Sequence, residues 1–91
     1  MVVKSQDKKH EIEYDEYLWG ISIGPNVKIR GWKFGLIVAT NIKTFKRINM
    51  AAFEDEDEAR AALRDIRKKA GEKKKSYSFK RHYLPVPYRK N

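Results

Sequence analysis

The sequence contains no cysteine, so neither a disulfide bond nor a cysteine-bound zinc ion can add to its stability. The N-terminus lacks the apolar run of a secretory signal peptide. No segment approaches the roughly 20 apolar residues that cross a membrane. These absences predict an intracellular protein, cytoplasmic or nucleoid-associated, without a membrane span. A chain of 91 residues has room for one small domain.

The sequence also lacks the patterns that indicate catalysis. The two histidines, His10 and His82, do not have the spacing of metal ligands, and there is neither a glycine-rich phosphate loop nor a nucleophile elbow. The acidic run 54–58 is more typical of a helix start than of a metal site. We therefore expect a protein that is not an enzyme and that uses no cofactor.

Acidic residues are missing from a long central stretch of a chain whose formal net charge is +9. No Asp or Glu occurs between Tyr17 and Phe53, although strands are poor in acids in general. The basic residues of this stretch are Lys28, Arg30, Lys33, Lys43, Lys46 and Arg47. Such an excess of one sign favours polyanionic partners, namely nucleic acid, an acidic protein surface or anionic lipid.

Alternating apolar residues predict strands at 17–23, 31–40 and 44–53, with a short hairpin turn near Asn41. In the second of these strands we assign Phe34 and Leu36 to the core side. The expected core consists of Trp19, Ile21, Phe34, Leu36, Ile48, Met50, Phe53, Leu63 and Ile66.

A helix is predicted immediately after the strands. Asp55, followed by Glu58 three residues later, has the spacing of a capping box, and Gly71 is a natural stop. The apolar stripe of this helix has the expected spacing of three and four residues: Ala59, Ala62, Leu63, Ile66 and Ala70.

These elements predict an α+β fold, a small antiparallel sheet of three to four strands with one α-helix packed on one face. We expect residues 1–16 to form a mobile arm, 17–71 the sheet-plus-helix domain and 72–91 a basic, aromatic tail. The arm has some strand character near Glu11, and the tail has a candidate last strand from Ser76.

The tail mixes basic and aromatic residues, which suits nucleic acid because cations follow phosphates and aromatic rings stack on exposed bases. Its basic residues include Lys73, Lys74, Lys75, Lys80 and Arg81. An equally good interpretation is that Tyr77, Phe79 and Tyr83 pack on the core while the lysines are solvated. The outer face of the helix, with Arg60, Arg64, Arg67 and Lys68, is more simply explained as solvated.

The segment Gly31-Trp32-Lys33-Phe34, together with the strand-to-helix junction 52–60, resembles the AP2-type domain and the arm-binding domains of tyrosine recombinases. In those families a three-stranded sheet lies in the DNA major groove. The resemblance implies that the groove would be read by Lys28, Arg30, Lys33, Lys46 and Arg47. Double-stranded-RNA-binding domains have a similar order of elements, but acids replace their basic cluster at the helix start.

The resulting hypothesis is a non-enzymatic nucleic-acid-binding module, with duplex DNA favoured over RNA. The expected contacts are Lys28, Arg30, Lys33, Lys46 and Arg47 from the sheet and Lys73, Lys74, Lys75, Lys80 and Arg81 from the tail. The alternative is a small inhibitor or adaptor that docks on an acidic surface of a larger enzyme, because small phage proteins with this role take the same general shape.

Overall fold

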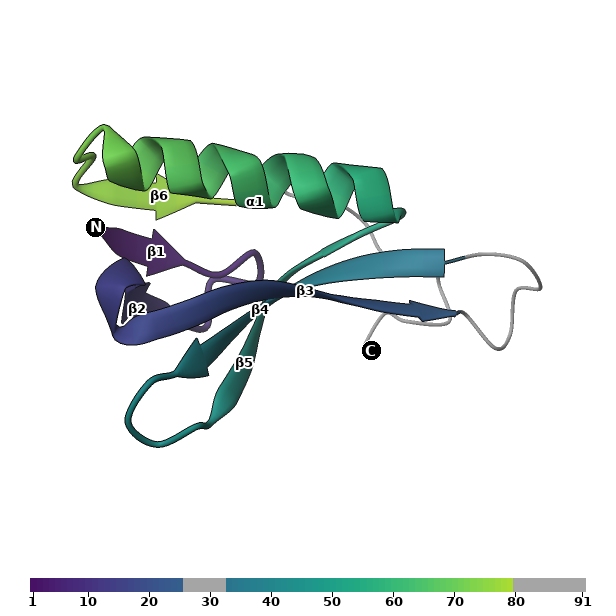
Figure 1. Ribbon diagram of the computed structural model, residues 1–91, viewed down its shortest axis with the longest axis horizontal. Coiled ribbons are helices and arrows are strands. Elements are labelled where there is room, and N and C mark those ends of the chain that lie inside the picture. Colours follow the sequence, from purple (N-terminus) through teal and green to yellow (C-terminus); the bar gives the residue numbers. More distant parts are fainter. Residues whose placement is uncertain (26–32, 80–91) are drawn as a thin grey trace.

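The computed structural model describes residues 1–25 and 33–79, which form two three-stranded sheets and one α-helix (Figure 1). In chain order the elements are β1 (Val2–Lys4), β2 (Glu11–Glu13), the 3₁₀ turn η1 (Tyr14–Glu16), β3 (Tyr17–Pro25), β4 (Lys33–Asn41), β5 (Arg47–Phe53), α1 (Glu56–Gly71) and β6 (Ser76–Ser78). The predicted α+β class, with an antiparallel sheet and one helix, is confirmed.

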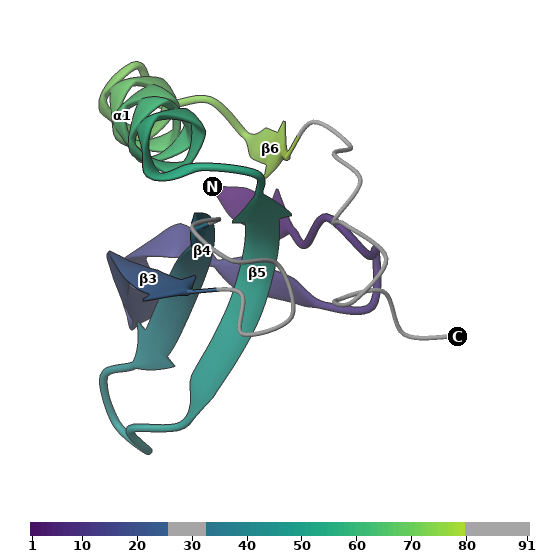
Figure 2. The ribbon, with the colours of Figure 1, turned by 90° about the vertical axis from the view of Figure 1, so that its right-hand side faces the viewer.

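The larger sheet has the antiparallel order β3-β4-β5, and α1 covers one of its faces (Figure 2). The pairs Trp19–Ala39 and Ile21–Ile37 lie opposite each other in register, so their side chains point to the same face. Ile37 and Ala39 are fully buried under the helix, and Trp19 and Ile21 pack partly buried against the same core. This face therefore forms the centre of the hydrophobic core.

The expectation that Leu36 points into the core from β4 is wrong, because the strand presents its other face to the helix. Leu36 is only half-buried, whereas Gly35 and Ile37 on the neighbouring positions are buried. Both faces of β4 are apolar. Because Gly35 has no side chain, Ala59 of α1 can approach the face of β4 that carries Gly35 and Ile37. The side chain of Phe34, the other predicted core residue of this strand, lies outside the described part.

A β-bulge changes the phase of β5. Ala51 lies opposite Ile37 but Asn49 lies opposite Val38, which leaves Met50 as the extra residue. The strand consequently buries four consecutive residues from Met50 to Phe53. Met50 and Phe53 are buried as predicted, and Ile48 packs partly buried against the core.

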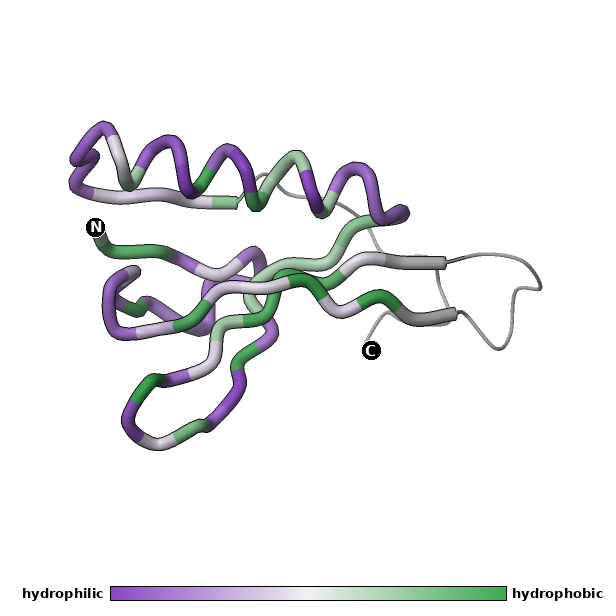
Figure 3. Tube along the Cα trace, in the orientation of Figure 1, coloured by the Kyte–Doolittle hydropathy of each residue, from purple (hydrophilic) through white to green (hydrophobic). Residues whose placement is uncertain are grey.

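The helix follows its prediction closely. The Asp55 carboxylate caps it by accepting a hydrogen bond of 2.8 Å from the main-chain N–H of Glu58. The side chains of Ala59, Leu63 and Ile66 are buried against the sheet, and the outward positions are hydrophilic (Figure 3).

The helix ends at Gly71, as predicted, but the left-handed residue that terminates it is Lys73 and not a glycine. Gly71 is the last helical residue, and Lys73 takes the left-handed conformation with φ 58°. The N–H of Lys73 donates to the carbonyl of Ala70 at 3.0 Å, and that of Lys74 donates to Lys69 at 3.2 Å. These two bonds form a Schellman motif with a lysine where glycine is usual.

The second sheet corrects the predicted arm and tail. Its order is β2-β1-β6, with β1 antiparallel to β2 and parallel to β6. Val3 is fully buried and Phe79 is almost so, and both belong to the core cluster. Residues 1–16 are therefore not a mobile arm, and residues 76–79 are part of the domain, because these apolar side chains complete a core that one sheet and one helix leave open.

Gln6 joins the two sheets. Its main-chain N–H donates to the carbonyl of Met50 at 2.7 Å. Its side-chain amide pairs with Ala52 in both directions, donating at 3.1 Å and accepting at 3.0 Å. Through these bonds Gln6, which lies just after β1, pairs with the edge of β5. Among the described residues there is no helix with the length and apolar character needed to cross a membrane.

Candidate nucleic-acid interface

The loop between β4 and β5, residues 42–46, is fixed by Asn41 at its base. The Asn41 side-chain oxygen accepts hydrogen bonds from the N–H groups of Lys43 at 2.8 Å and Thr44 at 3.0 Å. Its N–H donates to the carbonyl of Lys46 at 2.8 Å, and its carbonyl accepts from the N–H of Phe45 at 2.9 Å. Four hydrogen bonds on one residue give the loop a defined main-chain conformation.

Phe45 is the most exposed large hydrophobic side chain in the described part of the chain, with 76% of its surface accessible. Its main chain is left-handed, with φ 61°. An aromatic residue in this conformation costs about 1–2 kcal/mol relative to a right-handed one. The ring is largely exposed and contributes little burial to offset that cost, so the folded state alone does not account for a phenylalanine here.

Three cations lie within two positions of Phe45 in the chain. Lys43, Lys46 and Arg47 are all exposed, and none forms an ion pair with any described residue. Ile42, which is about half-exposed, is a second apolar side chain on the surface of this loop. The alternation of apolar and polar residues along the loop is visible in Figure 3. We refer to residues 42–47 as the basic-aromatic hairpin.

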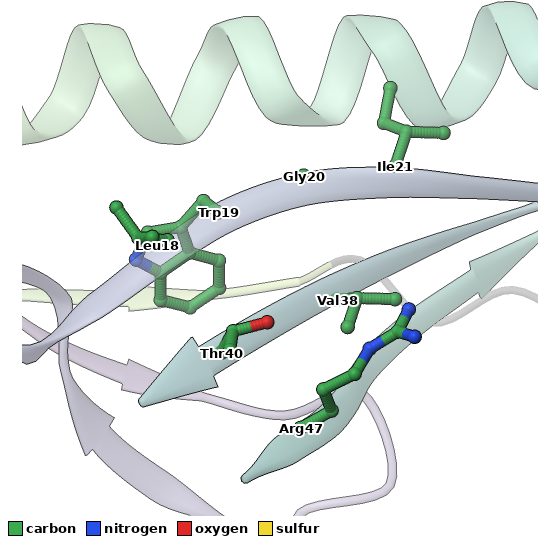
Figure 4. Close-up of a pocket in the computed structure, with 7 residues that line it drawn as sticks. All are labelled: Leu18, Trp19, Gly20, Ile21, Val38, Thr40 and Arg47. Carbon is green, nitrogen blue, oxygen red and sulfur yellow. The ribbon is translucent and has the colours of Figure 1, made fainter. Parts of the chain in front are cut away.

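Arg47 also reaches onto the sheet face that α1 leaves uncovered. It lies opposite Thr40 in register, and its side chain extends toward Val38 (Figure 4). A shallow pocket of about 200 Å³ is lined by Leu18, Trp19, Gly20, Ile21, Val38, Thr40 and Arg47. Leu18 at its rim is 66% exposed.

The predicted contact residues that the structure describes lie in two separate groups. Lys46 and Arg47 lie together in the hairpin, whereas Lys73, Lys74 and Lys75 lie exposed in the connection between α1 and β6. Lys33 belongs to β4, but its side chain lies outside the described part. The other predicted contacts lie wholly outside the described residues: Lys28, Arg30, Lys80 and Arg81.

An acidic segment separates the two basic surfaces. The carbonyl of Lys75 accepts a hydrogen bond from Val2 of β1 at 3.0 Å, and β1 in turn pairs with β2. The turn η1 then leads to the hairpin, where the N–H of Ile42 donates to the carbonyl of Glu16 at 3.1 Å. Between these points lie Glu11, Glu13, Asp15 and Glu16. Glu11 pairs with Lys4 and Glu13 pairs with the N-terminal amine, each at 3.4 Å, so Asp15 and Glu16 are the carboxylates of this segment that would repel a polyanion between the two surfaces.

Sequence reasoning missed Lys43 and Phe45 as site residues. The alternation of the chain predicts one strand over 44–53, which places Phe45 on a strand face. The strand begins only at Arg47. Turn residues are usually polar. The apolar residues Ile42 and Phe45, which follow the turn residue Asn41 and lie among lysines, were therefore the signal that could have indicated a site in this turn.

Two other polar groups near the β1–β2 turn have a structural role. Ser5 donates to the Asp7 carboxylate at 2.6 Å and accepts from the main-chain N–H of His10 at 3.0 Å. The serine hydroxyl, and then the N–H of Lys9, hold the pKa of Asp7 below its usual range. The imidazole takes no part in these bonds, so the cluster closes the turn rather than activating a nucleophile.

No three acidic or histidine side chains gather as metal ligands within residues 1–25 and 33–79. Comparison with family models, with curated proteins and with solved structures finds no match to this chain. The resemblance to AP2-type domains stays a prediction from the sequence. The geometry of the hairpin is therefore the basis for assigning a function.

Proposed function

We propose that this protein is a small, non-enzymatic nucleic-acid-binding module. The observation that carries the proposal is the basic-aromatic hairpin, where the exposed residues Lys43, Lys46 and Arg47 lie close in the chain to the exposed Phe45. Exposed cations that form no ion pair among the described residues are available to phosphates, and an exposed ring offers a flat apolar surface to a base. Nucleic acid lies in the cytoplasm or the nucleoid, so the proposal includes an intracellular location.

The test is fluorescence anisotropy with labelled single-stranded DNA, duplex DNA and RNA over a salt series. We expect binding whose logarithm falls linearly with the logarithm of the salt concentration. Lys46→Gln combined with Arg47→Gln should weaken binding and reduce the magnitude of the slope by about 1.4 on a single strand or 1.8 on a duplex, if each residue neutralises one phosphate.

The matched control removes one arginine and one lysine from the outer face of α1, as Arg64→Gln with Lys68→Gln. Both residues are exposed and form no ion pair with other described residues. The control has the same net charge as the hairpin variant. Equal losses in the two variants would reduce the effect to net charge and contradict the assigned site, and an absence of binding at low salt would contradict the function.

A protein partner is the second candidate, and the edge of the larger sheet favours it. β3 is nine residues long, pairs only with β4 among the described strands and exposes Leu18 and Ile23. Such an edge can accept a strand from another protein. The test is sedimentation of the chain with candidate acidic proteins, in which Leu18→Lys should abolish a complex that Lys46→Gln with Arg47→Gln leaves intact.

A further inference from the structure

The face of the larger sheet that α1 leaves uncovered carries few groups that can read a DNA groove. The register places Gly20 opposite Val38 and Ser22 opposite Leu36 on this face. Base edges are recognised by long side chains with hydrogen-bonding groups, such as Arg, Lys, Asn and Gln. In the described part of this face, Arg47 and Asn49 are the long polar side chains, and both belong to β5. The described part of this sheet face, inserted into a major groove, would therefore leave most of its surface without contacts to bases.

The hairpin has different properties. Its ring is 76% exposed, and the main chain that carries the ring is fixed by the bond from the Phe45 N–H to the Asn41 carbonyl. The ring therefore stands in solvent on a main chain that is already ordered, which lowers the entropy lost on binding. In a continuous duplex each base is stacked between its neighbours and its faces are covered. A base in a single strand has a free face.

The position of the aromatic residue supports the same conclusion. Glycine or asparagine is the usual residue at φ 61° in a hairpin loop. A phenylalanine there is unfavourable both for the main chain and for the exposure of its ring. A residue that folding disfavours at an exposed position is typical of a functional site.

We propose that Phe45 stacks on an unpaired base and that Lys43, Lys46 and Arg47 hold the adjacent phosphates, so that the ligand is a single strand rather than a continuous duplex. This inference rests on the proposed function and specifies its ligand. It differs from the duplex preference that the sequence suggests, because the described sheet face has few long polar side chains and the hairpin presents an exposed ring.

The experiment measures the affinity of the intact chain for three labelled probes of equal length: a thymidine strand, an abasic strand with the same phosphates, and a duplex. Phe45→Ala should weaken binding to the thymidine strand by about tenfold and leave binding to the abasic strand unchanged. Phe45→Tyr, which retains a ring, should bind like the wild type. Phe45→Leu, which retains only the apolar surface, should bind like Phe45→Ala.

Two controls separate stacking from other causes. Phe45→Gly should melt at a higher temperature than the wild type while binding the thymidine strand as weakly as Phe45→Ala, which excludes unfolding as the reason for the loss. Ile42→Ala removes a half-exposed apolar side chain from the same loop and should change binding little.

Each contrary outcome has its own meaning. Stacking would be overturned if Phe45→Ala weakened binding to the thymidine and abasic strands equally. It would also be overturned if the duplex bound as tightly as the thymidine strand and lost as much affinity in Phe45→Ala. Either outcome would leave the proposed function standing. A failure of all three probes to bind at low salt would overturn both. Vesicles of phosphatidylserine that bind the wild type and Phe45→Leu equally, without base-dependent strand binding, would assign the ring to a lipid surface instead.

Discussion

Gly35 of β4 lies so close to α1 that a β-carbon at this position would stand 2.5 Å from the β-carbon of Ala59. It would also stand 3.0 Å from the carbonyl oxygen of Asp55, the residue that caps the helix. Neither neighbour is the flexible end of a side chain, so the helix itself would have to move. The contact sets both the distance of α1 from the sheet and the face of β4 that becomes buried.

We therefore expect Gly35→Ala to lower the free energy of unfolding by about 1–3 kcal/mol, as overpacking of a core does. Gly20→Ala on β3 is the matched control, because a β-carbon there meets nothing within 4 Å. Urea denaturation of the three proteins gives the comparison. Equal stability of the two variants would mean that the helix does not depend on this close approach.

The hydroxyl of Tyr77 donates to the Asp65 carboxylate at 2.8 Å and links β6 to α1. Partial burial of the phenol, followed by this hydrogen bond and the negative charge of Asp65, raises the pKa of Tyr77 above its usual value of 10.0. The folded state thus holds the proton more tightly than the unfolded state does. The resulting stability is complete below pH 10 and decreases as the pH rises above it.

Unfolding by urea at several values between about pH 9 and pH 11.5 should show this decrease. In Tyr77→Phe the decrease should be smaller, because the variant has no phenol to ionise at this site. Lysine deprotonation affects both proteins and cancels in the difference between them. Parallel stability curves would show that Tyr77 does not contribute to the pH dependence.

Lys73 ends α1 in the left-handed conformation, with φ 58°. Lys73→Gly should stabilise the fold by roughly 0.5–1 kcal/mol, since glycine adopts this conformation without a steric penalty and its greater freedom in the unfolded chain offsets only part of the gain. For a domain of this size that corresponds to a rise of about 2–8 °C in melting temperature. Lys73→Ala removes the same charge without relieving the main chain, so any gain it shared with Lys73→Gly would have an electrostatic origin.

The helix and the larger sheet were predictable because their signals are local. The Asp55 cap and the apolar stripe of α1 lie within one short segment, and three strands of adequate length precede it. The buried face of β4 was not predictable from alternation, since both of its faces are apolar. The choice depends on the contact between Gly35 and Ala59, which are brought together only by folding.

The second sheet was predictable only in part. The strand character near Glu11 and the candidate strand from Ser76 coincide with β2 and β6. The strand β1 and the pairing were missed, because β1 has only three residues and pairs in parallel with β6 from the other end of the described chain. The candidate site was found in part. Lys46 and Arg47 follow from charge alone, whereas Phe45 depends on where the strand begins and on the loop that Asn41 fixes.

The separation of the two basic surfaces leads to a last prediction about how they combine. Lys73, Lys74 and Lys75 lie across the acidic segment from the hairpin, so we expect them to contact a different part of a long strand. Changing all three to glutamine should reduce the magnitude of the salt slope by up to about 2 for a long single strand, with little effect on a strand of a few nucleotides.

Because the surfaces share no residue or hydrogen bond among the described residues, their contributions should be additive. A protein that combines the three substitutions with Lys46→Gln and Arg47→Gln should lose, in the logarithm of its affinity for the long strand, the sum of the two separate losses. A combined loss well below that sum would show that the two sets of basic residues contact the same phosphates. The acidic segment would then not divide the surface, and the hairpin and the end of the helix would form one site.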